Sequence, residues 1–239
     1  MNAERYSRQI AIPEFGELGQ EKLENSSVLI IGAGGLGSNL MYALAGAGVG
    51  TIGIADHEIV KTNNLNTQFI HFEEDLGTLK VLSAAKKLRQ FNSFVNVIPH
   101  SVAINKDNAL ELISQYDVVV LAVNTMQARM IVNEACVTLG KPFANGEVNG
   151  NMGTATFIVP GKTPCLGCLY GTDILPEENY GAISTTTGII AYLEATAVIQ
   201  YLLGREVPME GKLFYYNSNT MDIEKNPLSF NEDCPVCGK

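Results

Sequence analysis

Short apolar runs alternate with segments of helical spacing along the first 150 positions. The run at 28–31 is followed by a cluster of glycines, and the next apolar run, at 51–55, ends at Asp56. The segment 38–47 between them has helical spacing, so the three form a strand–turn–helix–strand unit long enough for a right-handed crossover. Further helices are expected at 80–90, 107–115 and 125–139, and further strands at 95–99, 118–123 and 142–145.

This alternation predicts an α/β fold with an open, Rossmann-like doubly wound, mostly parallel sheet and helices on both faces. The pattern changes after position 149. A strand is expected at 154–159, a polar loop at 170–184 and a buried helix at 188–203. Two short runs, 212–216 and 220–224, predict a hairpin around 217–219. The C-terminal part is therefore expected to be a β-rich extension of the sheet.

Composition narrows the classes of protein that fit. With 46% hydrophobic residues in 239, the chain can bury a sizeable core. The net charge of -9 disfavours general binding to nucleic acid or to an anionic membrane, because like charges repel. No apolar run reaches the roughly 18 residues of a membrane span, and no signal peptide is visible. We therefore expect a cytoplasmic protein that binds neither nucleic acid nor membrane.

The glycine cluster has the spacing of a phosphate-binding turn. Gly32, Gly34 and Gly37 form G-x-G-x-x-G between a predicted strand and a predicted helix, with Gly35 as an additional glycine. This arrangement aims backbone N–H groups and the helix N-terminus at a phosphate. Asp56, at the end of the second strand, is suited to a ribose hydroxyl. The turn does not decide between NAD and ATP, and a tight turn without a ligand is the plain alternative.

Four of the five cysteines form two C-x2-C pairs. Four thiolates on two tight turns make the closed tetrahedral shell that structural zinc favours, and this shell would tie the C-terminal tail to the middle of the chain. Two disulfides or a redox motif are the alternatives, and both fit a cytosolic chain poorly. The fifth, Cys136, lies in an apolar helix and is expected to be a packed small residue. The predicted zinc ligands are Cys165, Cys168, Cys234 and Cys237.

Taken together, these motifs resemble the ThiF/MoeB/HesA group, the bacterial relatives of ubiquitin-activating enzymes, over nearly the whole chain. The pieces that carry the resemblance are residues 5–9, 28–37, 46–50, Asp56, Asn64 and Leu65 with Gln68, Gly77, Lys80 and both cysteine pairs.

The resemblance implies an ATP-dependent enzyme that joins the C-terminal carboxylate of a small ubiquitin-like protein or a peptide to AMP. It implies one adenylation domain, with a nucleotide-binding half at 1–149 and a zinc and substrate-tail half at 150–239. It places Gly35 at the phosphates, Asp56 at the ribose, and Asn64 and Lys80 near the triphosphate. Arg8 matches an arginine that reaches the neighbouring subunit's site, which implies a homodimer. The positive charges of Lys80, Arg8 and Mg2+ would offset the repulsion between a carboxylate and a phosphate.

Three positions or segments depart from the family's pattern. Thr67 stands where an arginine is usual, and Asn124 stands where an aspartate usually holds Mg2+. An amide oxygen can coordinate Mg2+ but lacks the charge. The loop at 170–187 contains no cysteine to accept the activated acyl group. We therefore expect adenylation without a covalent enzyme intermediate.

Two other functions compete with this one. A binding module that keeps the fold and the zinc but holds a peptide or partner protein would explain Thr67 and Asn124. An NAD-dependent oxidoreductase would explain only the glycine turn and Asp56. The three histidines, at 57, 71 and 100, show no ligand spacing, and no role is predicted for them.

Overall fold

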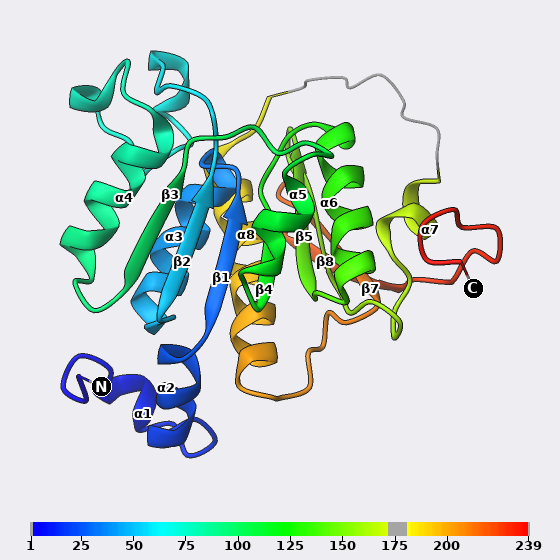
Figure 1. Cartoon of the computed structure of the whole chain (residues 1–239), viewed down its shortest axis with the longest axis horizontal. Coiled ribbons are helices and arrows are strands. Elements are labelled where there is room, and N and C mark those ends of the chain that lie inside the picture. Colours follow the sequence, from blue (N-terminus) through cyan, green and yellow to red (C-terminus); the bar gives the residue numbers. More distant parts are fainter. Residues whose placement is uncertain (1, 172–180, 239) are drawn as a thin grey trace.

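One mixed sheet organises the protein (Figure 1). The structure, a computed structural model, describes residues 2–171 and 181–238. The strands of this part are β1 Ser27–Ile31, β2 Thr51–Ala55, β3 Asn96–His100, β4 Val118–Leu121, β5 Phe143–Asn149, β6 Met152–Ile158, β7 Lys212–Asn217 and β8 Asp222–Pro227. Their order is β3-β2-β1-β4-β5-β6-β7-β8; β1 to β5 run parallel, and β6, β7 and β8 continue the sheet antiparallel.

Helices lie on both faces of this sheet, as the alternating pattern predicts. They are α1 Ser7–Ile10, α2 Gly16–Glu24, α3 Gly35–Ala47, α4 Lys80–Phe91, α5 Ala109–Ser114, α6 Met126–Leu139, α7 Leu166–Tyr170 and α8 Ser184–Leu202, with 3-10 turns η1 Thr62–Asn64 and η2 Glu73–Asp75. The buried side chains of α3, α4 and α8 form one core cluster with the sheet, and those of α5 and α6 form the other. The predicted doubly wound α/β fold is confirmed. None of the helices in the described ranges is long and apolar enough to cross a membrane.

Some element boundaries differ from the predictions for local reasons. The helix after the glycine turn begins at Gly35 rather than at 38, so the last glycines belong to its first turn. The short helix α7 was not predicted, because five residues carry too little periodicity. In the hairpin, Met221 adopts a positive φ of 61°, and the second strand begins at Asp222 rather than at 220. The predicted loop at 170–184 falls largely on 172–180, outside the described residues.

The strand order reverses at the boundary between β1 and β4. The chain leaves β1 for β2 on one side, while β4 continues to β5 on the other. In open α/β sheets, ligands bind outside the carboxyl ends of the strands at such a switch point. The glycine turn follows β1 and Asn124 follows β4, so the fold brings both to this position.

Candidate functional site

The glycine turn is packed so closely that side chains are excluded at two of its positions. Gly32 has φ of 107°, and a Cβ there would lie 2.3 Å from the carbonyl oxygen of Ala122, the residue directly after β4. A Cβ on Gly37 would lie 2.0 Å from the carbonyl oxygen of Gly32. Both contacts are far inside van der Waals distance. These two glycines let the turn fold back between β1 and β4.

The beginning of α3 presents a row of free donors. Within the part of the chain that the structure describes, the backbone N–H groups from Gly34 to Gly37 have no hydrogen-bond partner; the next one, from Ser38, donates to Gly34 O at 2.9 Å. Unpaired N–H groups and the positive end of the helix dipole both favour an anion. This arrangement can accommodate a phosphate group.

Asp56 fixes the turn from the side of β2. Its Oδ2 accepts a hydrogen bond from Ala33 N at 2.8 Å, and its Oδ1 accepts one from Glu58 N at 2.8 Å. The carboxylate is only partly buried, and each oxygen keeps a second lone pair. Asp56 can therefore hold the turn and still accept from a ligand hydroxyl.

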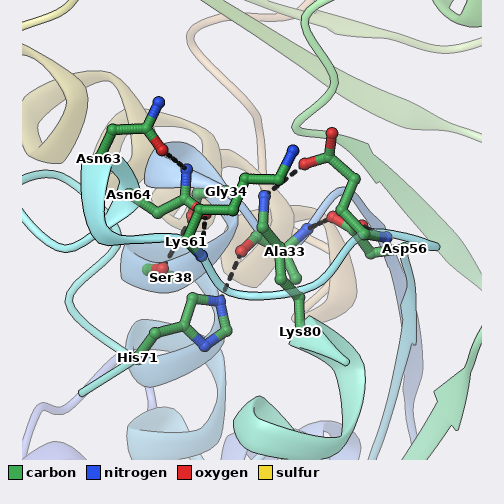
Figure 2. A network of polar contacts seen from close by, with 10 residues as sticks. Ala33, Gly34, Ser38, Asp56, Lys61, Asn63, Asn64, His71 and Lys80 are labelled. Atoms are coloured by element: carbon green, nitrogen blue, oxygen red, sulfur yellow. Dashed lines mark hydrogen bonds and ion pairs between the residues drawn. The ribbon is translucent and has the colours of Figure 1, made fainter. Parts of the chain in front are cut away.

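Lys80 is a buried cation at the start of α4, whereas a solvated helix face is the usual place for a lysine. It is 3% exposed, and its Nζ lies 2.6 Å from Oε2 of Glu58, whose side chain is half exposed. Chiefly through this hydrogen bond, Lys80 lowers the pKa of Glu58, so the Glu58 carboxylate is charged at neutral pH. Figure 2 shows Lys80 and Asp56 beside Ala33 and Gly34. A fixed positive charge thus stands next to the phosphate-binding turn.

The segment at 61–68 covers the turn. Asn64 closes its own loop by accepting from Lys61 N at 2.9 Å, and Thr67 lies over Gly35, with its Cβ 3.5 Å from the place of a Cβ on that glycine. The amide of Gln68 faces Gly34, and its Oε1 is buried without a hydrogen-bond partner among the described residues. The fold thus brings Asn64 and Gln68, which the family resemblance singled out, close to the glycine turn (Figure 2).

Asn124 stands exposed just beyond β4. The loop that carries it is held by Arg129, a residue that the sequence analysis did not single out. Arg129 is 2% exposed and donates to Val123 O at 2.6 Å, to Gly146 O at 2.9 Å and to the side chain of Asn145. These bonds join the segment that follows β4 to the middle of β5 and so hold the loop that carries Asn124.

Arg8 lies away from the glycine turn of its own chain. The neighbouring Gln9 donates to Ala47 O at 2.8 Å, at the C-terminal end of α3, whereas the turn is at the other end of that helix. Thirteen residues of α-helix span roughly 20 Å. Arg8 is exposed and has no hydrogen-bond or ion-pair partner among the described residues. The fold therefore does not bring Arg8 to Lys80 within one chain.

The two C-x2-C pairs meet at the far edge of the sheet, where the C-terminal segment lies beside α7 (Figure 1). All four Sγ atoms lie within 4.8 Å of one another; Cys165 and Cys234 are 3.7 Å apart, and Cys168 and Cys237 are 3.4 Å apart. Four sulfurs around zinc at about 2.3 Å would be separated by roughly 3.8 Å. None of the five cysteines forms a disulfide. The cluster is therefore compatible with a bound zinc ion.

Comparison with known proteins assigns the family. A model of the ThiF family matches residues 6–236. The chain belongs to the ThiF family. It is 38% identical over 239 residues to the adenylyltransferase and sulfurtransferase MOCS3 of Culex quinquefasciatus, covering 98% of this chain and 55% of that protein. It is 36% identical over 243 residues to the SAMP-activating enzyme E1 of Haloferax volcanii, covering 99% of this chain and 89% of that protein.

This ThiF-family chain thus spans about half the length of the MOCS3 relatives that it matches. Among solved structures it is similar to E. coli MccB in complex with AMPCPP and selenomethionine-labelled MccA, with a TM-score of 0.88 and 26% identity over 99% of this chain and 75% of that one. MccB in complex with ATP gives a TM-score of 0.84 and 26% identity over 92% of this chain and 68% of that one. The predicted resemblance to this family is confirmed.

His71 is the site residue that sequence reasoning missed. It is 3% exposed, its Nε2 lies 3.0 Å from Ala33 O, and its Nδ1 lies 2.9 Å from Oγ of Ser83. The three histidines show no ligand spacing in the sequence, so no role is predicted for His71 from the sequence alone. Its hydrogen-bond partners lie in the glycine turn and in α4, which are distant in the sequence. These contacts therefore become visible only in the folded structure.

A buried acid in α8 gives a testable pH dependence. Glu194 is fully buried against Gly146, and neither of its oxygens has a hydrogen-bond partner among the described residues. Burial raises the pKa of Glu194 well above its usual value, although the charge of Arg129 opposes the shift. The unfolded chain releases this proton at about pH 4.3, whereas the folded chain keeps it. Stability should therefore fall as pH rises above this value, by about 1.4 kcal/mol per pH unit, until the folded-state pKa is reached.

Glu194→Gln should remove this contribution, since the amide has nearly the shape of the protonated acid and does not titrate. We expect the variant to be more stable than the wild type at pH 7 and their stabilities to converge near pH 4. Denaturant unfolding at several pH values measures the difference, with Glu134→Gln, an exposed residue on α6, as the control. A constant offset between Glu194→Gln and the wild type at all pH values would contradict the assignment of a buried proton.

Proposed function

We propose that this chain uses ATP to adenylate the C-terminal carboxylate of a small ubiquitin-like carrier protein or of a peptide. The observation that carries the proposal is the row of free N–H groups from Gly34 to Gly37 at the switch point, with the buried Lys80 beside it. The names of the relatives agree with it, because MOCS3 is an adenylyltransferase and the Haloferax protein activates SAMP. The MccB complexes contain ATP or its analogue.

Each predicted site residue takes a role in this proposal. Gly32 and Gly37 shape the turn, Gly34 and Gly35 donate to phosphate, and Asp56 accepts from the ribose. Lys80, Asn64 and Gln68 lie around the triphosphate. The exposed amide oxygen of Asn124 would hold Mg2+ at the end of β4, where the ion would neutralise phosphate charge. The nucleotide-binding half would be 1–149, and the substrate tail would lie against 150–239.

The reaction is a displacement at the α-phosphorus. A carboxylate oxygen forms a new bond to that phosphorus, and the bond to the bridging oxygen breaks, so that pyrophosphate leaves and an acyl-adenylate remains. Both reactants are anions, so their approach is opposed by charge. Lys80 and the N–H groups of the turn stabilise the charge on the phosphate oxygens in place of water.

We propose that no enzyme thioester forms within these residues. Four of the five cysteines lie in the metal cluster, and burial raises the pKa of the fifth, Cys136, far above its usual value. A thiol that stays protonated is a poor nucleophile. The loop at 170–187 carries no cysteine. An external nucleophile therefore collects the acyl group.

The four-cysteine cluster is proposed to hold structural zinc. Its four sulfurs leave no open coordination position, so the ion would support the fold rather than the reaction. It would fasten the C-terminal segment, which carries Cys234 and Cys237, to α7. We further propose that the protein acts in the cytoplasm, where thiols stay reduced and can bind a metal.

The position of Arg8 supports a homodimer in which each active site combines two chains. Arg8→Ala and Lys80→Ala proteins should each be inactive, whereas their mixture should regain activity. Random pairing gives half heterodimers, each with one intact site, so about a quarter of wild-type activity is expected. The assay is pyrophosphate release after mixing and subunit exchange. A mixture that stays as inactive as its components, with heterodimers shown by native mass spectrometry, would contradict the shared site.

The first test of the nucleotide half is calorimetric titration with ATP, with and without Mg2+. Adenylation requires magnesium-dependent binding in the micromolar range and pyrophosphate release when a free carboxylate tail is added. The uncharged Thr67 and Asn124 favour a second candidate, a module that binds a peptide without reaction. Tight peptide binding that is indifferent to ATP and Mg2+ would support that module and contradict adenylation.

A further inference from the structure

A continuous chain of hydrogen-bonded side chains connects α4 to the glycine turn. Lys87 is 5% exposed and forms a buried ion pair with Asp75. Its Nζ also lies 3.5 Å from Oγ of Ser83, which lies 2.9 Å from Nδ1 of His71. The other ring nitrogen of His71 lies 3.0 Å from Ala33 O (Figure 2). Four side chains thus connect α4 and η2 to the peptide between Ala33 and Gly34.

The chemistry of the two ends fixes the direction of every bond in this chain. A carbonyl oxygen only accepts, so Nε2 of His71 must carry a proton. With the proton on Nε2 of a neutral ring, Nδ1 can only accept, so Oγ of Ser83 donates to Nδ1, while the Asp75 carboxylate, which also faces this hydroxyl, accepts from Lys87. Burial lowers the pKa of His71, and the hydrogen bond to Ala33 O and the charge of Asp75 oppose this shift only in part, so the ring is neutral at pH 7. The ring is therefore held as the Nε2–H tautomer.

Fixing the Ala33 carbonyl also fixes the next N–H. No peptide bond in the described chain is cis, and in a trans peptide the C=O and the N–H point in opposite directions. Because the carbonyl of Ala33 points toward His71, the N–H of Gly34 points to the opposite side of the turn. That N–H has no hydrogen-bond partner among the described residues. Asp56 fixes the preceding peptide through Ala33 N, so both peptides that flank Ala33 are restrained.

We propose that His71 is a positioning residue of the nucleotide site, which orients the N–H of Gly34 toward the phosphate by donating to Ala33 O. The proposal rests on the proposed binding of ATP. His71 does not touch the ligand; it holds the donor that does. A turn whose peptide is free to rotate would offer its carbonyl oxygen to the phosphate for part of the time, and like partial charges would oppose binding.

Two amide variants separate this role from simple packing. The amide nitrogen of glutamine reaches about as far as Nε2 of histidine, and that of asparagine about as far as Nδ1. His71→Gln can therefore still donate to Ala33 O, whereas His71→Asn can reach only Ser83. Both variants lose the ring and keep an amide, and asparagine is smaller by one methylene group, so the stability of both variants must be measured beside their affinity.

The experiment is calorimetric titration of both variants with ATP and Mg2+, with thermal unfolding as the stability control. We expect a dissociation constant within about threefold of the wild type for His71→Gln and about tenfold weaker or more for His71→Asn, since hydrogen bonds to charged groups are strong. In a pyrophosphate-exchange assay, KM for ATP should rise in His71→Asn while kcat changes little. Equal affinities in the two variants, whether both normal or both weak, would overturn the proposal.

A second measurement uses the wild-type protein and does not depend on the folding of a variant or on ATP binding. Nitrogen NMR of protein labelled at its three histidines reports the tautomer of each ring. The proposal requires neutral His71 with the proton on Nε2 at pH 7; an Nδ1–H tautomer or a charged ring would overturn it. If the wild type binds no ATP, the proposed function fails, while the NMR result still decides whether His71 holds the turn.

Discussion

Replacing Cys168 by serine is expected to lower the stability of the protein by at least about 4 kcal/mol, because the proposed zinc shell would then lack one ligand. Structural zinc contributes about 10–16 kcal/mol to the folding of small zinc-finger peptides, so even partial loss is large. For a chain of this length, the change corresponds to a fall in melting temperature of about 10 °C. The C-terminal segment depends most on the metal, since its β8 strand is exposed along its whole length.

Thermal unfolding together with metal analysis measures this effect. The wild type should contain one zinc ion per chain, and Cys168→Ser should contain little. Cys136→Ala is the matched control, because this cysteine is buried in α6 and lies outside the cluster. It should lose about 1 kcal/mol for a small cavity and keep its zinc. An unchanged melting temperature in a zinc-free Cys168→Ser protein would show that the cluster does not hold the fold.

Truncating Lys80 to alanine is expected to reduce the rate of adenylation by about 10²–10³-fold, the usual effect of removing one preorganised donor to developing charge. The lysine is buried beside the phosphate-binding turn, so water cannot easily replace it. The fold should tolerate the change, because the partner, Glu58, is half exposed and can be hydrated once the ion pair is gone.

The matched control for this variant is Lys86→Ala on the same helix. Lys86 is exposed, and its Nζ lies 3.7 Å from the exposed Glu74, so its loss should change neither stability nor rate noticeably. Single-turnover formation of the acyl-adenylate at saturating ATP gives the rate of the chemical step. A Lys80→Ala protein that retains a rate within tenfold of the wild type would remove Lys80 from the catalytic machinery.

The parts of the site that follow one another along the chain could be predicted from the sequence. The glycine turn, Asp56 and Asn124 each follow a buried apolar run, and parallel strands bring their carboxyl ends to one edge. The meeting of the two cysteine pairs could also be predicted, because a closed tetrahedral shell needs four ligands and each pair supplies two. The position of Asn64 and Gln68 over the turn came from the resemblance rather than from any periodicity.

The side chains beneath and beside the turn could not be predicted in the same way. His71 and Arg129 form hydrogen bonds with backbone carbonyl oxygens of residues distant in the chain. Every residue has such a carbonyl, so the sequence does not indicate which one is contacted. Lys80 and Lys87 both lie on α4 and are buried in ion pairs with Glu58 and Asp75, and no spacing along the chain predicts these pairs. Glu194 lies within the helix predicted at 188–203, and only the fold shows that Gly146 makes room for its carboxyl group.

The central claim, adenylation of a C-terminal carboxylate, is tested most directly by isotope exchange between ATP and pyrophosphate. Each carrier protein or peptide is supplied twice, once with a free C-terminal carboxylate and once as the C-terminal amide. The account predicts magnesium-dependent exchange with the free carboxylate of at least one tail and none with its amide. Nucleotide binding without exchange for any free carboxylate in a panel of ubiquitin-like tails and peptides, or equal exchange with the amide, would contradict it.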